Sequence, residues 1–79
     1  IYQILSAAQS KLTEMTPQAL TEWVVAEVER EPLLKVIYFQ AVDALSLQQV
    51  SSWEESERIQ GCIAVQAGEI RLIDNIKLK

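Results

Sequence analysis

The stretch from residue 64 to residue 78, "AVQAGEIRLIDNIKL", decides the fold because it combines a turn with the strongest strand pattern in the chain. Gly68 can adopt the positive φ that tight hairpin turns require, so we expect the turn at Ala67-Gly68. Strands are expected on both sides of it, over residues 58–66 and 69–78. The sequence therefore predicts a C-terminal β-hairpin.

A carboxylate and an amide, Asp74 and Asn75, interrupt the last strand. Alternation places two sets of side chains on opposite faces: Ile70, Leu72, Asp74 and Ile76 on one, and Arg71, Ile73, Asn75 and Lys77 on the other. Burying a carboxylate among aliphatic side chains is costly unless it accepts hydrogen bonds or meets a cation. We therefore expect Asp74 to accept backbone or cross-strand hydrogen bonds that fix the strand against a neighbouring loop.

A further strand is expected upstream, over residues 33–42, where β-branched and aromatic residues are dense. Its two faces carry Val36, Tyr38, Gln40 and Val42, and Lys35, Ile37, Phe39 and Ala41, respectively. Both faces are largely apolar, which favours a central position in the sheet.

The segment between this strand and the hairpin is expected to be irregular. A turn or short helical segment should hold Leu45, Leu47 and Val50, followed by a solvated loop over residues 51–57 with Trp53 as its aromatic anchor. Two serine–glutamate pairs in that loop have capping-box spacing: Ser51 with Glu54, and Ser52 with Glu55.

Two helices are expected before the strands. The first has an apolar stripe made of Ile1, Ile4, Leu5, Ala8, Leu12 and Met15. Thr16 is suited to cap the second helix and Pro17 to its first turn, so that helix should run to about Arg30, before Pro32. Its inward stripe is Leu20, Trp23, Val24 and Val28. The predicted class is α+β, with two N-terminal helices packed on a small, mainly antiparallel three-stranded sheet.

Composition indicates a single soluble domain. The chain has 79 residues, of which 49% are hydrophobic and 23% charged, as in globular proteins. A net charge of −4 argues against nucleic-acid binding. The longest stretch without a charge, residues 59–68, is far shorter than the roughly 20 apolar residues of a membrane span. No signal-peptide pattern opens the chain. We expect a cytoplasmic location.

The residues needed for independent catalysis are scarce. The sequence contains no histidine, which removes the usual general base, the commonest metal ligand and every Ser-His or Cys-His pair. The single cysteine, Cys62, can form neither an internal disulfide nor a multi-cysteine metal site. It lies in an apolar run, so we expect a buried thiol. No catalytic, cofactor-binding or metal-binding residue is predicted.

Two separated motifs resemble one enzyme family. Ala64-Val65, Gly68 and the run Arg71-Leu72-Ile73-Asp74-Asn75 are similar to the C-terminal signature of the pantothenate synthetases, also called pantoate:beta-alanine ligases. The run from Tyr38 to Asp43, followed by Leu47, resembles that family's tyrosine-led strand and the turn after it. The resemblance covers essentially the whole chain and is specific from Lys35 to Leu78.

The resemblance implies a cytoplasmic ATP-dependent ligase of pantothenate biosynthesis, the route to coenzyme A. Such enzymes adenylate pantoate with release of pyrophosphate, and the amine of beta-alanine then displaces AMP. The family's histidine-containing nucleotide motif and Ser-Arg loop belong to a Rossmann-like N-terminal domain and the domain junction. Neither motif is present in this sequence, which begins within the helix that follows the loop.

The chain over residues 1–79 is therefore expected to be the C-terminal lid domain of a larger ligase, inactive alone, whose partner is the N-terminal domain of its own parent chain. ATP and Mg²⁺ would be bound by the full-length enzyme, not by this fragment. Whether the parent is also fused to a downstream cytidylate kinase stays open.

Two other classes remain as alternatives. One is a stand-alone α+β module that binds another protein or a small regulator. The other is a small enzyme with Asp43, Asp74 or Glu69 as a general base. A base needs an electrophilic or cationic companion, and alternation places the nearest candidate, Arg71, on the opposite face from Asp74.

Overall fold

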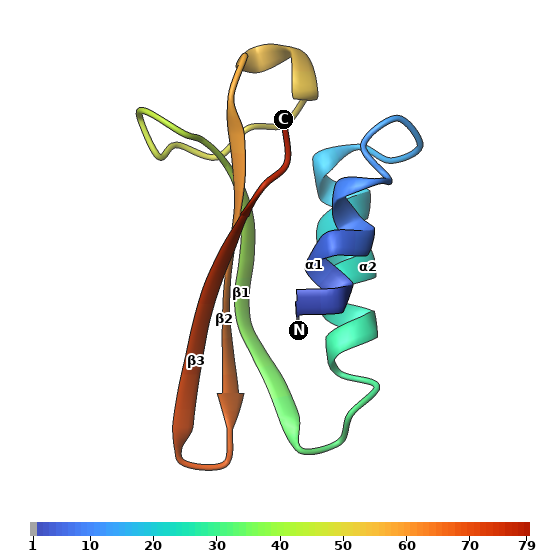
Figure 1. The fold of residues 1–79 in the computed structure, drawn as a ribbon, viewed down its shortest axis with the longest axis vertical. Helices are drawn as coiled ribbons and strands as arrows, with labels where there is room; N and C mark the ends of the chain where they lie inside the picture. The colour runs from blue at the N-terminus through green and yellow to red at the C-terminus, as the bar shows by residue number, and fades with distance from the viewer. Residues whose placement is uncertain (1) are drawn as a thin grey trace.

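Two helices cover one face of a three-stranded antiparallel sheet in the computed structural model, which describes residues 2–79 (Figure 1). The elements are α1 (Tyr2–Gln9), α2 (Pro17–Val28), β1 (Leu34–Asp43), the 3₁₀ helix η1 (Trp53–Glu55), β2 (Ile59–Ala67) and β3 (Ile70–Lys77). This arrangement confirms the predicted α+β class and its C-terminal hairpin.

The first helix is shorter than its apolar stripe predicted. α1 ends at Gln9, because the N–H groups of Ser10 and Lys11 bond to carbonyls only three residues back, which tightens the last turn. Leu12 and Met15 still pack against the core, but from a loop. Ile1 lies outside the described residues. The Gln9 side-chain amide donates to the Lys77 carbonyl at 2.7 Å and ties this helix to β3.

The second helix begins as predicted. The Thr16 hydroxyl accepts a hydrogen bond from the Ala19 N–H at 3.2 Å, and Pro17 occupies the first turn. The helix ends at Val28, two residues before the predicted Arg30. Its inward stripe packs against the sheet, with Leu20, Val24 and Val28 buried and Trp23 half-buried.

The strand order is β1-β2-β3, so the prediction that residues 33–42 form the central strand is wrong. A bulge explains the misleading pattern. Val36 lies opposite Val65 and Tyr38 opposite Ala64, which leaves Ile37 as an extra residue. The bulge reverses the alternation, so that Val36 and Phe39 both face the helices. Both faces of β1 therefore contain apolar residues although it is an edge strand.

The core lies between the helices and the inward side of β2. Its fully or almost fully buried residues come from both helices, β1, β2 and the segment after β3: Leu5, Ala8, Leu20, Val24, Val28, Phe39, Ala41, Ile59, Ile63, Val65 and Leu78. Gly61 lies opposite Ala41 and Ile76 on the neighbouring strands. The Leu78 side chain and the Phe39 ring occupy the space that a larger side chain at residue 61 would need.

The hairpin turn is displaced by one residue from its predicted position. Ala67 pairs with Ile70, so the turn is formed by Gly68 and Glu69. Gly68 has a φ of 61°, as expected for the glycine of this turn.

The segment between β1 and β2 is irregular apart from η1. A turn covers residues 44–46, and Leu47 has a φ of 61°. Ser52 caps η1, and the Glu55 carboxylate accepts a hydrogen bond from the Ser51 N–H at 2.8 Å. The two predicted capping-box pairs are therefore not formed as such. The predicted anchoring by Trp53 is confirmed, because its Nε1–H donates to the Met15 carbonyl at 2.6 Å.

Replacing Gly61 with alanine should destabilise the fold by overpacking. The added Cβ would lie 3.1 Å from Leu78 Cδ1 and 3.2 Å from Phe39 Cζ. We expect a loss of about 1–3 kcal/mol, measured as a lower urea midpoint at an unchanged m-value. Leu78→Val, which shortens the contacted side chain, should recover part of the loss.

Gly68→Ala provides the matched control. Its Cβ would meet nothing within 4 Å, so only the positive φ opposes it, at about 1 kcal/mol. Leu78→Val should not rescue this variant. A Gly61→Ala protein as stable as the wild type would show that Leu78 and Phe39 can move apart without loss.

Candidate functional site

The carboxylates considered as general bases lie apart. Asp43 ends β1 opposite Ile59, Asp74 lies on β3 opposite Ile63, and Glu69 is in the hairpin turn. The two β2 positions are about 13 Å apart along the strand. Within residues 2–79, no three His, Cys, Asp or Glu side chains lie close enough together to hold a metal ion.

Asp43 is held by its own loop. Its carboxylate accepts hydrogen bonds from the Leu45 and Ser46 N–H groups, both at 2.8 Å, and from the Ser56 hydroxyl at 2.5 Å. The Ser56 hydrogen bond, followed by the two backbone bonds, lowers the Asp43 pKa from an ordinary value of 3.8 to about 2. A carboxylate with so low a pKa is a poor general base. Asp43 therefore anchors the loop after β1.

Asp74 is exposed, which contradicts the expectation of a buried carboxylate. As predicted, it shares a face with Ile70, Leu72 and Ile76, and this face is turned toward the helices, since Asp74 lies opposite the buried Ile63. That face is poorly covered at β3, however, and Leu72 is 42% exposed there. The Asp74 carboxylate accepts one local hydrogen bond, from the Asn75 N–H at 2.8 Å. The expected cross-strand or loop contact is absent from the hydrogen bonds of residues 2–79.

The sheet register also shows where the side chains of Arg71 and Cys62 point. Arg71 lies opposite Gln66, on the face away from Asp74, so these two residues do not form an acid–base pair. Cys62 also points away from the helices, opposite Gln40 and Asn75, and is half-buried rather than fully buried. Desolvation raises the pKa of its thiol. The thiol is therefore protonated and weakly nucleophilic at neutral pH.

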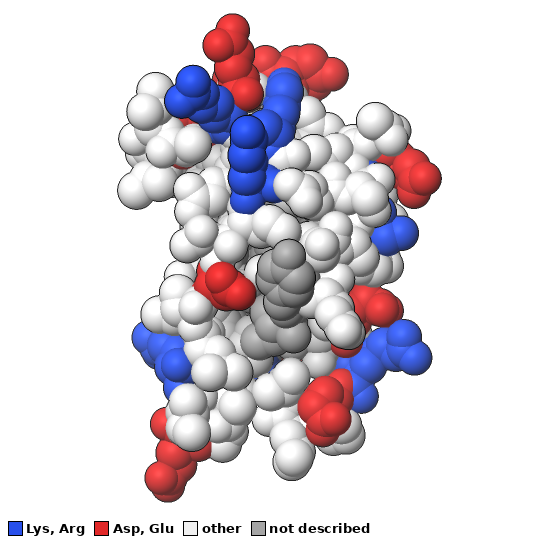
Figure 2. All heavy atoms as spheres, viewed as in Figure 1, with Lys and Arg blue, Asp and Glu red and all other residues white. Residues whose placement is uncertain are grey.

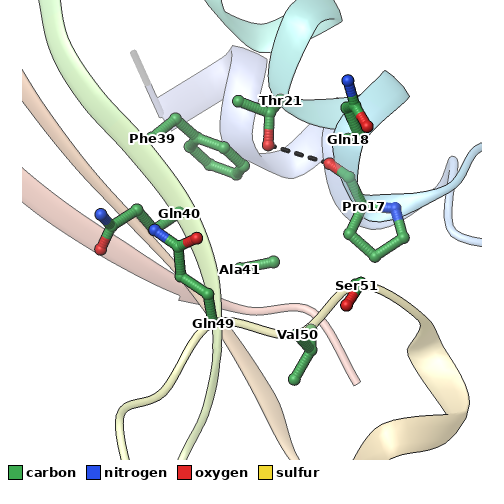
Figure 3. Close-up of a pocket in the computed structure, with 9 residues that line it drawn as sticks. All are labelled: Pro17, Gln18, Thr21, Phe39, Gln40, Ala41, Gln49, Val50 and Ser51. Atoms are coloured by element: carbon green, nitrogen blue, oxygen red, sulfur yellow. Dashed lines mark hydrogen bonds between the residues drawn. The ribbon is translucent and has the colours of Figure 1, made fainter.

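One pocket, of about 520 Å³, lies where the start of α2 meets β1 and residues 49–51 (Figure 3). The Thr21 hydroxyl donates to the Pro17 carbonyl at 2.9 Å beside the Phe39 ring. All nine lining residues are uncharged: Pro17, Gln18, Thr21, Phe39, Gln40, Ala41, Gln49, Val50 and Ser51. The pocket offers hydrogen bonds but no acid, base or cation. Sequence patterns did not reveal it, because three separate segments form it.

A second pocket, of about 390 Å³, is rich in cations. Arg58, Lys77 and Lys79 line it together with Ala44, Ile59, Gln60 and Asn75. Figure 2 shows Lys and Arg atoms gathered near the end of the molecule at which the chain terminates in Figure 1. The Lys79 ammonium donates to the Trp53 and Ser56 carbonyls, which holds it in place. This pocket can attract an anion.

A larger pocket, of about 680 Å³, lies between residues 12–17 and the η1 region, where the hydrogen bond from Trp53 to Met15 connects its two sides. In this pocket the Ser52 hydroxyl donates to the Glu54 carboxylate, and that hydrogen bond lowers the Glu54 pKa, which makes the carboxylate a weaker base. The other two pockets have no Asp or Glu in their linings.

Comparison with known proteins identifies the family. The family model for pantoate-beta-alanine ligase matches residues 1–77. The chain belongs to the pantoate-beta-alanine ligase family. It is 43% identical over 77 residues to a pantothenate synthetase of Porphyromonas gingivalis, covering 98% of this chain and 27% of that protein. It is also 43% identical over 79 residues to a pantothenate synthetase of Bacteroides thetaiotaomicron, covering 100% of this chain and 28% of that protein.

A solved structure agrees with the fold. The crystal structure of pantothenate synthetase from Thermus thermophilus matches with a TM-score of 0.82 at 22% sequence identity, over 98% of this chain and 28% of that chain. The chain thus spans little more than a quarter of the length of the relatives it matches. The family resemblance predicted from the two sequence motifs is confirmed.

The Asp43 anchor should make stability depend on pH. Because the folded-state pKa is lowered to about 2, the carboxylate stabilises the fold above pH 4 and loses this effect as the pH falls from about 4 to 2. Asp43→Asn should be less stable than the wild type at pH 6, and the gap should narrow toward pH 2. Urea unfolding of both proteins at several pH values between 6 and 2 measures the difference in their free energies of unfolding.

Ser56→Ala is the matched control, because it removes the strongest hydrogen bond to the Asp43 carboxylate but keeps the charge. In this variant the folded-state pKa of Asp43 should lie closer to 3.8, so the acid loss should be smaller and should be complete at a higher pH than in the wild type. A gap between wild type and Asp43→Asn that stays constant from pH 6 to pH 2 would show that Asp43 is not held as described.

Proposed function

We propose that the chain is the C-terminal domain of a pantothenate synthetase and acts as a lid over the active-site cleft of the rest of that enzyme. The proposal rests on how much of each relative's length this chain matches. Relatives named pantothenate synthetase match 98–100% of this chain but only 27–28% of their own length. The scattered carboxylates of residues 2–79 also fit a domain that leaves the chemistry to the remainder.

The parent would join pantoate to beta-alanine at the expense of ATP. In the first step, a pantoate carboxylate oxygen attacks the α-phosphorus of ATP and pyrophosphate leaves, which gives pantoyl adenylate. The beta-alanine amine then attacks the acyl carbon, and AMP leaves as the amide of pantothenate forms. We assign the binding of ATP and Mg²⁺, which neutralises phosphate charge, to the rest of the parent.

The contribution of a lid is to exclude water. An acyl adenylate is open to hydrolysis, which competes with attack by the amine, so covering the cleft preserves the intermediate. The structure suits such a role, because its layers are joined by fully buried side chains, among them Leu20, Val24, Ile63 and Val65. A domain packed in this way moves as one body.

A cytoplasmic location is part of the proposal. Cys62 is a free thiol, as is usual for proteins of a reducing compartment. Within residues 2–79, neither helix has the length and apolar content needed to cross a membrane.

The isolated 79-residue chain should not catalyse pantoate-dependent exchange between ATP and labelled pyrophosphate, whereas the full-length parent should. The reason is that residues 2–79 bring no catalytic constellation together. Exchange by the isolated chain would contradict our assignment of the chemistry to the rest of the enzyme. A parent that is inactive with pantoate, ATP and beta-alanine would contradict the proposed function itself.

Asp74→Asn in the full-length parent should leave turnover and thermal stability nearly unchanged. Asp74 is exposed, and asparagine keeps an oxygen that can accept the Asn75 N–H. Exposed substitutions of this kind alter stability by about 0.5 kcal/mol or less. Steady-state kinetics and thermal melts test this. Lost turnover at an unchanged melting temperature would make Asp74 a functional residue and contradict our interpretation.

A further inference from the structure

The sheet has one face that no helix covers, and its exposed charges have one sign. We call it the open face, and define it by Lys35, Tyr38, Ala64, Arg71, Ile73 and Lys77, whose side chains point away from the helices according to the strand register. Figure 1 shows α1 and α2 together on the other side of the sheet.

The charges of the strands are segregated between the two faces of the sheet. Lys35, Arg71 and Lys77 are on the open face, where the strands contribute no Asp or Glu. The acidic residues of the strands, Asp43 and Asp74, lie opposite the inward-facing Ile59 and Ile63. None of the nine glutamates lies in a strand: five are in residues 2–32, and Glu54, Glu55, Glu57 and Glu69 are in η1, the loop after it and the hairpin turn. A chain with a net charge of −4 thus presents a basic sheet face.

The centre of the open face is apolar. Tyr38 and Ile73 flank Ala64 in one row across the three strands, and they are 39% and 68% exposed. Lys35 and Arg71 lie on one side of this row and Lys77 on the other. An apolar centre with an aromatic side chain and a charged rim is the usual anatomy of a protein interface.

The open face is better matched to a protein surface than to a small anion as its binding partner, because its charges lie far apart. Arg71 and Lys77 are six residues apart on β3, or about 20 Å, which exceeds the Debye length of about 8 Å at physiological ionic strength. Partners must therefore neutralise these charges separately. The cation-rich pocket formed by Arg58, Lys77 and Lys79 continues the same face at one end and can receive a carboxylate.

A second copy of this chain is a poor partner for the open face. Two open faces packed together would place like charges opposite one another, which is unfavourable. The rest of the parent is the better partner, because the matched relatives have nearly three-quarters of their length outside this segment.

We propose that the open face docks on the rest of the parent chain, against a surface that is acidic around an apolar centre. This inference rests on the proposed function, since it names the partner of the lid. Docking would bury Ile73 and Tyr38, and the cations would pair with carboxylates at the rim, where their main effects are on orientation and association rate.

Cysteine labelling in the full-length parent tests the docking. Leu72 and Ile73 are neighbours on β3 and are both exposed, at 42% and 68%, but they point to opposite faces. We compare the rates at which a maleimide modifies Leu72→Cys and Ile73→Cys, following the modified peptide by mass spectrometry. Ile73→Cys should react about tenfold more slowly, which corresponds to about 1.4 kcal/mol of protection.

Several results would overturn the docking. In this domain Ile73 is the more exposed of the two, so equal or faster labelling at residue 73 would show that the rest of the parent leaves the face open. Protection that appears only after ATP is added would show that the rest of the parent does not cover the face by itself. Protection that disappears on dilution would identify a second copy.

A charge reversal tests the acidic character of the partner surface. Arg71→Glu, added to the Ile73→Cys parent, should abolish the protection, whereas Arg30→Glu should leave it intact. Arg30 is the matched control, because its side chain is 75% exposed and it follows α2 in the other layer. Protection that survives Arg71→Glu would overturn the acidic partner surface.

Pyrophosphate exchange measured on the same samples separates the two proposals. An active parent with an unprotected Ile73→Cys overturns the docking and leaves the proposed function standing. An inactive parent with a protected Ile73→Cys does the reverse.

Discussion

The inward side of β2 is the constraint on which the rest of the structure depends. Ile59, Ile63 and Val65 are buried there at every second position, and Gly61 between them makes room for Leu78 and Phe39. Both neighbouring strands must pair with β2, and both helices must cover the same side of it. Because those side chains face the core, alternation along the strand turns the remaining side chains of β2 to the opposite face. The side chains of β1 and β3 that are paired with them point the same way.

Local residues were sufficient to predict the elements, whereas contacts between distant residues decided their arrangement. The Thr16 cap, the Pro17 start and the positive φ of Gly68 depend on neighbours in sequence, and all three are confirmed. The edge position of β1 depends on pairing with residues at least 16 positions away, and the two pairs that flank the bulge at Ile37 are more than 25 positions apart. No periodicity within a single strand contains that information, so the same apolar pattern suggested a central strand.

The two aspartates show the same limit for the candidate site. The sequence located Asp43 and Asp74, and alternation placed Asp74 on the correct face. It could not show that Ser56 reaches Asp43 from beyond η1, or that the helices leave β3 poorly covered at Leu72 and Asp74. Asp43 is consequently held by three donors with a lowered pKa, while Asp74 lies in water with one local hydrogen bond. The environment, which differs between two identical side chains, decides their roles.

The net charge of this domain does not show how its charges are distributed over the sheet. A value of −4 suggests an acidic protein, but alternation along β1 and β3 directs Lys35, Arg71 and Lys77 to one side of the sheet. Asp43 and Asp74 lie on the other face, and the glutamates lie outside the strands. Because the two faces of the sheet differ in the sign of their strand charges, an acidic surface favours one orientation of the domain over the other. The lid that we propose would need no catalytic residue of its own to affect the reaction, since its contribution would be the position in which it excludes water.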